Sequence, residues 1–126
     1  MPEPAATPTP IADPTPGPLD GDDPVAALAV LLEQRERCVR DLSVLCLDGV
    51  LQAGSAAMAR DAALIGEVQS GGEIGAHAVI TAVEATLVER LGDSALVSLG
   101  DVPKSQPAST LLMKGEAGWR IRGYLD

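Results

Sequence analysis

The spacing of apolar residues changes once along this chain, and that change limits the folds available to it. From Pro24 to Val68 the apolar residues recur with the spacing of amphipathic helices. The glycines at 71 and 72 end this pattern, and from Val79 onward apolar and polar residues alternate as they do in strands. Helices followed by strands indicate the α+β class, with N-terminal helices packed on one face of an antiparallel sheet.

The helical part begins and divides at recognisable capping residues. Asp23 followed by Pro24 is typical of a helix N-terminus, because the carboxylate caps free N–H groups and proline lacks one. Residues 41–43 carry cap chemistry that permits a break into a second, short helix. Ser55 is expected to cap a third helix; it is not a nucleophile, because the motif G-x-S-x-G is absent.

The alternating part predicts a meander of at least four antiparallel strands. The expected strands are 79–90, 94–99, 109–114 and Gly118–Leu125. In the last of them the alternation places Trp119, Ile121, Gly123 and Leu125 on one face, and Arg120, Arg122 and Tyr124 on the other. Since the chain has no Phe and a single Trp, Trp119 is expected to anchor the core.

The first 23 residues differ in composition from the rest. Seven of the ten prolines lie between Pro2 and Pro18, together with five acids and no Lys or Arg. Such a segment buries too little apolar surface to offset the entropy of ordering it. We predict a disordered, extended, acidic Pro-rich linker over 1–23 and a folded domain over 24–126. The alternative is a docking ligand built on TPTP or PTPGP.

Charge and hydropathy exclude some partners. Of the net charge of −9, −4 remains when the five acids of the linker are set aside, and the nine Lys and Arg residues are dispersed. This distribution does not favour nucleic acid or an acidic membrane surface. The sequence lacks a signal-peptide pattern and a membrane-length apolar run, so no membrane insertion is predicted. Because spacers usually follow another domain, we expect this chain to be the C-terminal part of a larger protein.

The layout resembles the NTF2-like (cystatin-like cone) superfamily. The resemblance covers about 24–126 and is carried by residues 37–65, RCVRDLSVLCLDGVLQAGSAAMARDAALI, and by the ending GEAGWRIRGYLD at 115–126. It implies a long first helix, one or two short helices and a bent sheet that closes over them. Residues 37–65 resemble C-terminal accessory modules of bacterial membrane or kinase-like proteins. The superfamily also contains isomerases and dehydratases, whose cones hold Asp, His and Tyr.

Cys38 and Cys46 are the most informative pair in the chain. On one continuous helix they would lie about 12 Å apart, beyond the roughly 7 Å that a disulfide spans, so a bridge requires the chain to turn at 41–43. The alternatives are a disulfide and two free, buried thiols. A bridge indicates an extracytoplasmic location, and free thiols a cytoplasmic one. Two Cys and one His leave a zinc site short of a ligand, so no metal is predicted.

The remaining candidate residues suggest binding rather than chemistry. Trp119, Arg122, Tyr124 and His77 are candidate ligand-binding residues, since Arg and aromatic residues are enriched at recognition sites. His77 is the only histidine and Tyr124 the only tyrosine, and neither has an evident acid or base partner. No catalytic residue and no cofactor is predicted.

The sequence therefore favours a non-catalytic NTF2-like accessory domain that binds a protein or small ligand, or associates with itself as a homodimer. The alternative is an isomerase- or dehydratase-type enzyme that uses the cone as its pocket. The lining of the cone distinguishes them. A pocket converging on His77, Tyr124 or a buried carboxylate such as Glu84 favours the enzyme, whereas a cone filled by Leu, Val and Trp119 favours the binding domain.

Overall fold

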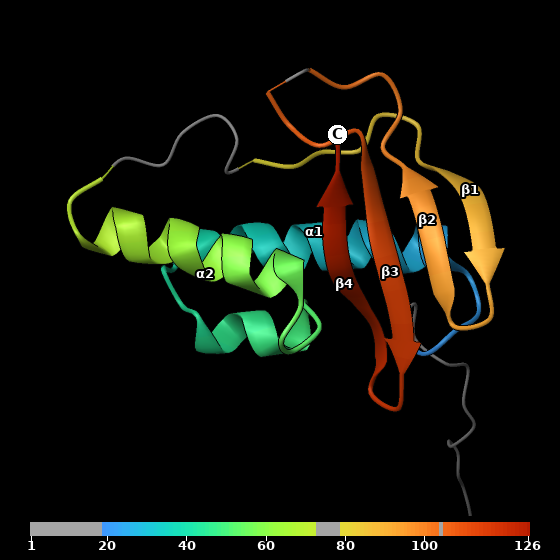
Figure 1. The fold of residues 1–126 in the computed structure, drawn as a ribbon, viewed down its shortest axis with the longest axis horizontal. Coiled ribbons are helices and arrows are strands. Elements are labelled where there is room, and N and C mark those ends of the chain that lie inside the picture. Colours follow the sequence, from blue (N-terminus) through green and yellow to red (C-terminus); the bar gives the residue numbers. More distant parts are fainter. Residues whose placement is uncertain (1–18, 73–78, 104) are drawn as a thin grey trace, which may run out of the picture.

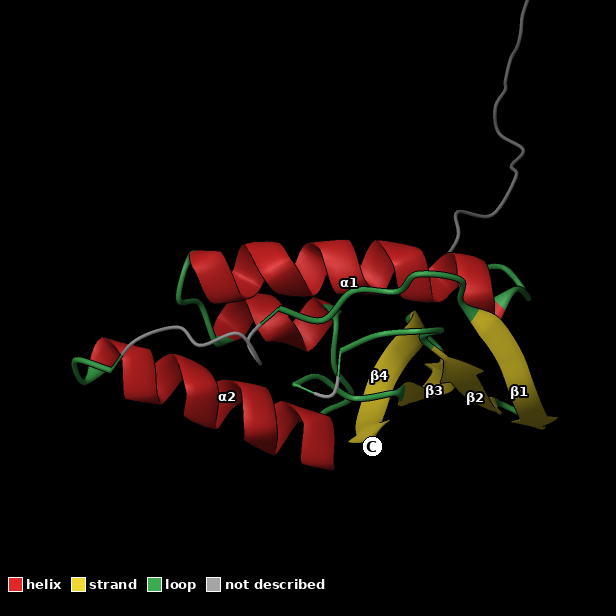
Figure 2. Cartoon of the chain, turned by 90° about the horizontal axis from the view of Figure 1, so that it is seen from above, coloured by secondary structure: helices red, strands yellow, loops and turns green. Residues whose placement is uncertain are grey.

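The computed structural model describes residues 19–72, 79–103 and 105–126. Its elements are α1 (Pro24–Arg40), a short 3₁₀ helix η2 (Leu45–Gly49), α2 (Ala56–Gln69), β1 (Thr86–Leu91), β2 (Ser94–Ser98), β3 (Ser109–Gly115) and β4 (Gly118–Leu125). The strands form one antiparallel sheet in the order β1-β2-β3-β4. Figure 2 shows α1 across one face of the sheet and α2 beside β4. The predicted α+β class is confirmed (Figure 1).

Helix α1 begins and ends at the residues that the sequence indicated. The Asp23 carboxylate accepts hydrogen bonds from the backbone N–H groups of Val25 and Ala26. After Arg40 the chain reverses at Leu42, whose φ of 52° lies in the left-handed region, and the N–H of Ser43 bonds back to the carbonyl of Cys38. This C-terminal turn directs the chain back along α1 into η2.

The segment between η2 and α2 attaches the helices to the free edge of β4. Ile121 accepts a hydrogen bond from the N–H of Gln52 and donates its own N–H to the carbonyl of Val50. Ser55 then caps α2 through its hydroxyl, which accepts from the N–H of Met58. Because these bonds occupy part of the β4 edge, β4 is protected there from pairing with another strand.

The core lies between the helices and the concave side of the sheet. Its fully buried members include Leu28 and Leu31 of α1, Leu47, Leu51, Ile65, Val97, Leu99, Leu112, Trp119 and Ile121. Trp119 is the largest of these side chains. This agrees with the expectation that it anchors the core, since Tyr124 is the only other aromatic residue of the chain. In a chain without Phe, small aliphatic side chains and one indole therefore fill the interior.

The first predicted strand was too long. The expected strand covered 79–90, but β1 comprises only Thr86–Leu91. Residues 80–82 instead lie beside α1, and the backbone of Thr81 bonds to the side-chain amide of Gln106 rather than to a neighbouring strand. Alternating apolar and polar residues indicate an extended chain with one side buried. They do not show whether its backbone hydrogen bonds go to another strand or to a side chain. The other three strands agree with prediction to within one residue.

A β-bulge corrects the predicted faces of β4. Leu111 pairs with Gly123 and Leu112 pairs with Ile121, so Arg122 is an extra residue on β4. Trp119 and Ile121 face the core as expected. Beyond the bulge the alternation is inverted, so Tyr124 points toward the helices and Leu125 away from them. Strict alternation had predicted the reverse for these last two residues. The prediction was wrong because the inserted residue exchanges the faces of all residues that follow it in the strand.

Residues 19–23 form a strap over Trp119. The carbonyl of Leu19 accepts from the backbone N–H of Trp119 at 2.9 Å, and that of Gly21 accepts from the indole Nε1 at 3.0 Å. Arg90 donates to the carboxylate and the carbonyl of Asp22 at 2.6 and 2.9 Å. Gly118, with a φ of 102°, allows this approach, since a Cβ there would collide with the carbonyl of Leu19.

Candidate functional site

Two features of the structure have functional potential: a buried polar network on the helix side of the sheet and an apolar surface on the opposite side. The network connects α1, α2 and β4. Arg35 Nε and Nη2 donate to the two carboxylate oxygens of Asp61, each at 2.9 Å, and the Tyr124 hydroxyl donates to Asp61 at 2.5 Å. Arg35 and Asp61 are both buried. This is a bidentate, charge-assisted arrangement.

The network fixes the protonation states of Tyr124 and Arg35. Burial, together with the charge of Asp61, raises the pKa of Tyr124 far above its usual range, so the phenol remains a hydrogen-bond donor. Burial lowers the pKa of Arg35, but the hydrogen bond to Asp61 and the other contacts of the guanidinium outweigh this effect and raise it overall. Both oxygens of Asp61 are engaged. A phenol and a carboxylate held in this way fasten three elements together and do not resemble a poised acid–base pair.

The sequence interpretation missed Arg35 and Asp61, although a signal was present. Arg35 follows Leu31 and Leu32 by four and three residues and precedes Cys38 by three, so it lies on the apolar stripe of α1. Asp61 occupies the same kind of position in α2, four residues before Ile65. Charged residues on the buried stripes of two helices indicate a buried ion pair, because an unpaired charge there would be too costly.

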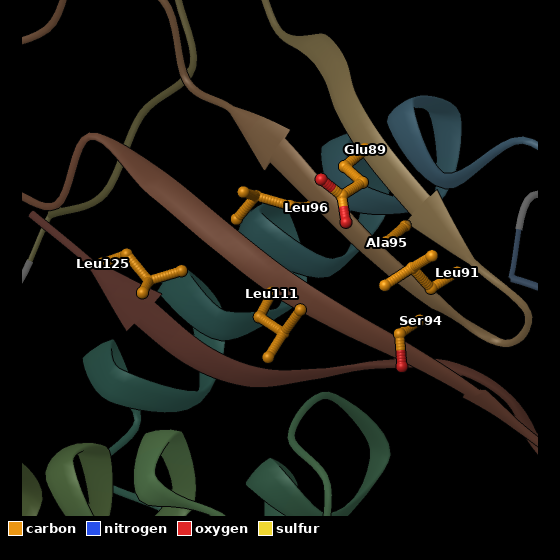
Figure 3. A pocket seen from close by; sticks show the side chains of 7 residues that line it. All are labelled: Glu89, Leu91, Ser94, Ala95, Leu96, Leu111 and Leu125. Atoms are coloured by element: carbon orange, nitrogen blue, oxygen red, sulfur yellow. The ribbon is translucent and has the colours of Figure 1, made fainter.

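The apolar surface lies on the side of the sheet that faces away from α1 (Figure 3). A hollow of about 270 Å³ is lined there by Glu89, Leu91, Ser94, Ala95, Leu96, Leu111 and Leu125. A second hollow of about 400 Å³ adjoins it around β4 and is lined by Gly54, Ser55, Ala56, Leu111, Arg122, Gly123, Tyr124 and Leu125. Leu111 and Leu125 belong to both. We call the surface formed by Leu91, Leu96, Leu111, Leu125, Glu89 and Arg122 the outer face.

The outer face has an ordered arrangement. Glu89 of β1, Leu96 of β2, Leu111 of β3 and Gly123 of β4 pair in one row across the sheet, with Arg122 next to Gly123. Leu91 is 69% exposed and Leu125 is 45% exposed. Leucines therefore occupy the middle and corners of the face, an acid lies at the β1 edge and a base lies at the β4 edge.

The predicted site residues are dispersed in the structure. Trp119 is fully buried beneath the strap, with Arg90 and Lys114 over its ring, so it serves the core and not a ligand-facing surface. Tyr124 belongs to the buried network, and Arg60 lies over its ring at 5.1 Å. Arg122 is exposed beside the outer face. His77 lies outside the described residues.

Three further residues named from the sequence are clearly placed. Cys38 and Cys46 are joined by a disulfide, with their Cα atoms 5.4 Å apart, because the turn at Leu42 returns the chain to the end of α1. Glu84 is exposed and is not a buried carboxylate. Across the described ranges, no helix has the length and apolar character needed to cross a bilayer.

Comparison with known proteins yields no relative: neither a family model nor a curated protein nor a solved structure matches the chain. The functional argument therefore depends on the geometry of the chain itself.

Proposed function

We propose that the chain is a non-catalytic accessory domain of the NTF2-like type, which binds a partner protein or a small apolar ligand, or a second copy of itself, through the outer face. The observation that carries this proposal is the contrast between the two sides of the sheet. Among the described residues, the side toward the helices is packed with buried side chains, whereas the side away from them is apolar and hollowed.

The filled side argues against an internal pocket. An NTF2-like enzyme would need open space between its sheet and its helices. Here Trp119, Leu112 and Ile121 of the sheet are fully buried against Leu28 and Leu31 of α1. A substrate of even modest size would have to displace the indole, which is packed among the aliphatic side chains of the core.

The outer face argues for binding. Antiparallel sheets usually expose a polar face to water, and contiguous apolar patches on a soluble domain mark interaction sites. Leu96 and Leu111 are direct cross-strand partners in the middle of this face, and Leu91 and Leu125 extend the apolar surface to either side. Their burial in a complex would remove this apolar surface from water.

The disulfide supports an extracytoplasmic location for this domain. Structural disulfides persist in oxidising compartments and are rare in the cytosol. The Cys38–Cys46 bridge fastens the end of α1 to η2, as expected of a small domain whose core lacks large aromatic side chains.

The alternative, an isomerase or dehydratase, is favoured by one observation. Tyr124 contacts a buried carboxylate, Asp61, and also borders the second hollow. However, the phenol is already committed as a donor to Asp61, and Arg35 occupies both oxygens of that carboxylate. A reaction at this place would require the network to come apart.

Methyl and indole NMR spectra recorded during titration with small apolar fragments test the proposal. We expect shifts at Leu96, Leu111 and Leu125 and little change at the Trp119 indole or at Leu112. Leu111→Ser should abolish these shifts. Leu45→Ser is the matched control, because Leu45 is 83% exposed at the start of η2, outside the outer face, and should leave the shifts intact. Shifts centred on Trp119 and Tyr124 would instead favour the enzyme.

A further inference from the structure

We infer that the occupant of the outer face is a second copy of this chain, packed face to face so that β1 of each copy lies over β4 of the other. This inference rests on the proposed function, since it names the partner of the same surface. It follows from the way leucines and charges are distributed over the face.

The leucines are arranged for self-packing. Leu96 of β2 and Leu111 of β3 are paired at the centre of the four-stranded sheet. A twofold axis parallel to the strands, passing between β2 and β3, places Leu96 of one copy over Leu111 of the other, and the reverse. The contact therefore has four leucines at its centre, with Leu125 and Leu91 at its periphery.

The charges are self-complementary under the same axis. Glu89 lies at the β1 edge in the row of Leu96 and Leu111, and Arg122 lies next to Gly123 at the β4 end of that row. Since the axis exchanges β1 and β4, Glu89 of each copy faces Arg122 of the other. Among the residues that the structure describes, neither has an ion-pair partner within its own chain. One face thus supplies both members of two equivalent pairs.

The size of the face predicts a weak, reversible dimer. Strands spaced by about 4.8 Å, with a rise of about 3.3 Å per residue, give a sheet face of about 400 Å² in projection. Side-chain relief and residues 54–56 beside β4 enlarge the accessible area. Standard interfaces bury about 800 Å² per partner. This face lies at or below that size, which is typical of weak, transient complexes, so we expect a dissociation constant in the micromolar range.

Sedimentation velocity of the full chain over about 1–500 μM, a range that brackets this constant, tests the inference. We expect monomer at the low end and dimer at the high end. Leu111→Ser, with the helical circular dichroism unchanged, should leave only monomer, whereas the control Leu45→Ser should dimerise like the parent chain. Monomer at every concentration, or a dimer that persists in Leu111→Ser, would overturn the inference.

Charge exchange tests the register. Glu89→Arg and Arg122→Glu should each weaken self-association by about tenfold, because each puts like charges together at two places. An equimolar mixture of the two single variants should associate like the parent chain, since the mixed pair restores both contacts. The double variant should also be restored. If the mixture stays as weak as either variant alone, β1 does not lie over β4 and the inference fails.

The two proposals fail in different ways. A chain that stays monomeric but shows fragment-induced shifts at Leu96 and Leu111 would retain the binding function and lose the self-association. A chain that dimerises through another surface, with no shifts on the outer face, would lose both.

Discussion

Arg35 and Asp61 show how single residues can set the cost of unfolding this domain. Each carries a charge into a core of small aliphatic side chains, and each is hydrogen-bonded to the other and to Tyr124. A buried ion pair contributes little net stability compared with apolar residues of the same shape, but loss of one partner leaves an uncompensated charge. The network therefore makes the relative positions of α1, α2 and β4 sensitive to single substitutions.

We expect Asp61→Asn to lower the free energy of unfolding by about 3–5 kcal/mol, because the buried guanidinium of Arg35 loses its counter-charge. Urea denaturation followed by circular dichroism measures this. Arg37→Ala is the matched control: Arg37 pairs with Glu33 on the exposed side of the same helix, and its loss should change stability by at most about 0.5 kcal/mol. Equal effects of the two substitutions would contradict a structural role for the network.

At the scale of elements, the helix boundaries and most strands were predictable, and the reasons are local. Asp23, Ser55 and the glycines after α2 act on neighbouring backbone groups, so their effect is visible in the sequence. The bulge at Arg122 and the early departure from strand geometry before Thr86 were not visible, because both depend on which residues lie opposite. For the same reason Tyr124 was predicted to lie on the surface of the sheet, whereas in the structure it belongs to the buried network.

The outer face illustrates the same limit. Its leucines come from all four strands, and no short window of sequence contains more than two of them. Their gathering on one side follows from the register of the sheet and from the inverted alternation beyond the bulge, which moves Leu125 to that side. Arg122 was named from the sequence as a binding residue, but its position at the end of the row that begins with Glu89 became visible only with the topology.

The disulfide joins the end of α1 to η2, and its contribution to the free energy of unfolding should be modest. It closes a short loop, so the loop-entropy model assigns it about 2.5 kcal/mol. We expect a reductant to lower the midpoint of urea denaturation by an amount that corresponds to this loss. The double variant Cys38→Ala/Cys46→Ala should show the lower midpoint with and without reductant. A parent chain whose midpoint does not respond to reductant would mean that the corner is held by other contacts.

At the scale of the whole molecule, the strap fastens the segment before α1 to Arg90 of β1 and Trp119 of β4. Arg90 holds the pKa of the Asp22 carboxyl below its usual range, through a hydrogen bond and its charge. A lowered pKa in the folded state means that this contact stabilises the strap above the ordinary Asp pKa of about 3.9. The stabilisation is lost as the pH falls through the lowered value, when Asp22 takes up a proton.

We therefore expect the fluorescence of Trp119, the only tryptophan, to be constant down to about pH 4 and to shift slightly to longer wavelength below it, because the strap loosens when it loses this contact while its carbonyl bonds to Trp119 and Arg90 remain. Far-UV circular dichroism recorded in parallel separates release of the strap from unfolding. In Asp22→Asn the emission should already be shifted at neutral pH and should lack the acid step. An identical acid step in that variant would assign the transition to another group.

The strap also determines how the domain responds to a pull. Leu19 is bonded beside Trp119 at the beginning of β4, and Asp126 lies just beyond its other end. Tension applied between residues 19 and 126 is first carried by the few strap bonds to Trp119 and Arg90. The β3–β4 bonds, which run perpendicular to the strands, bear it only after the strap has separated. Stretching would thus uncover the indole before it disrupts the sheet.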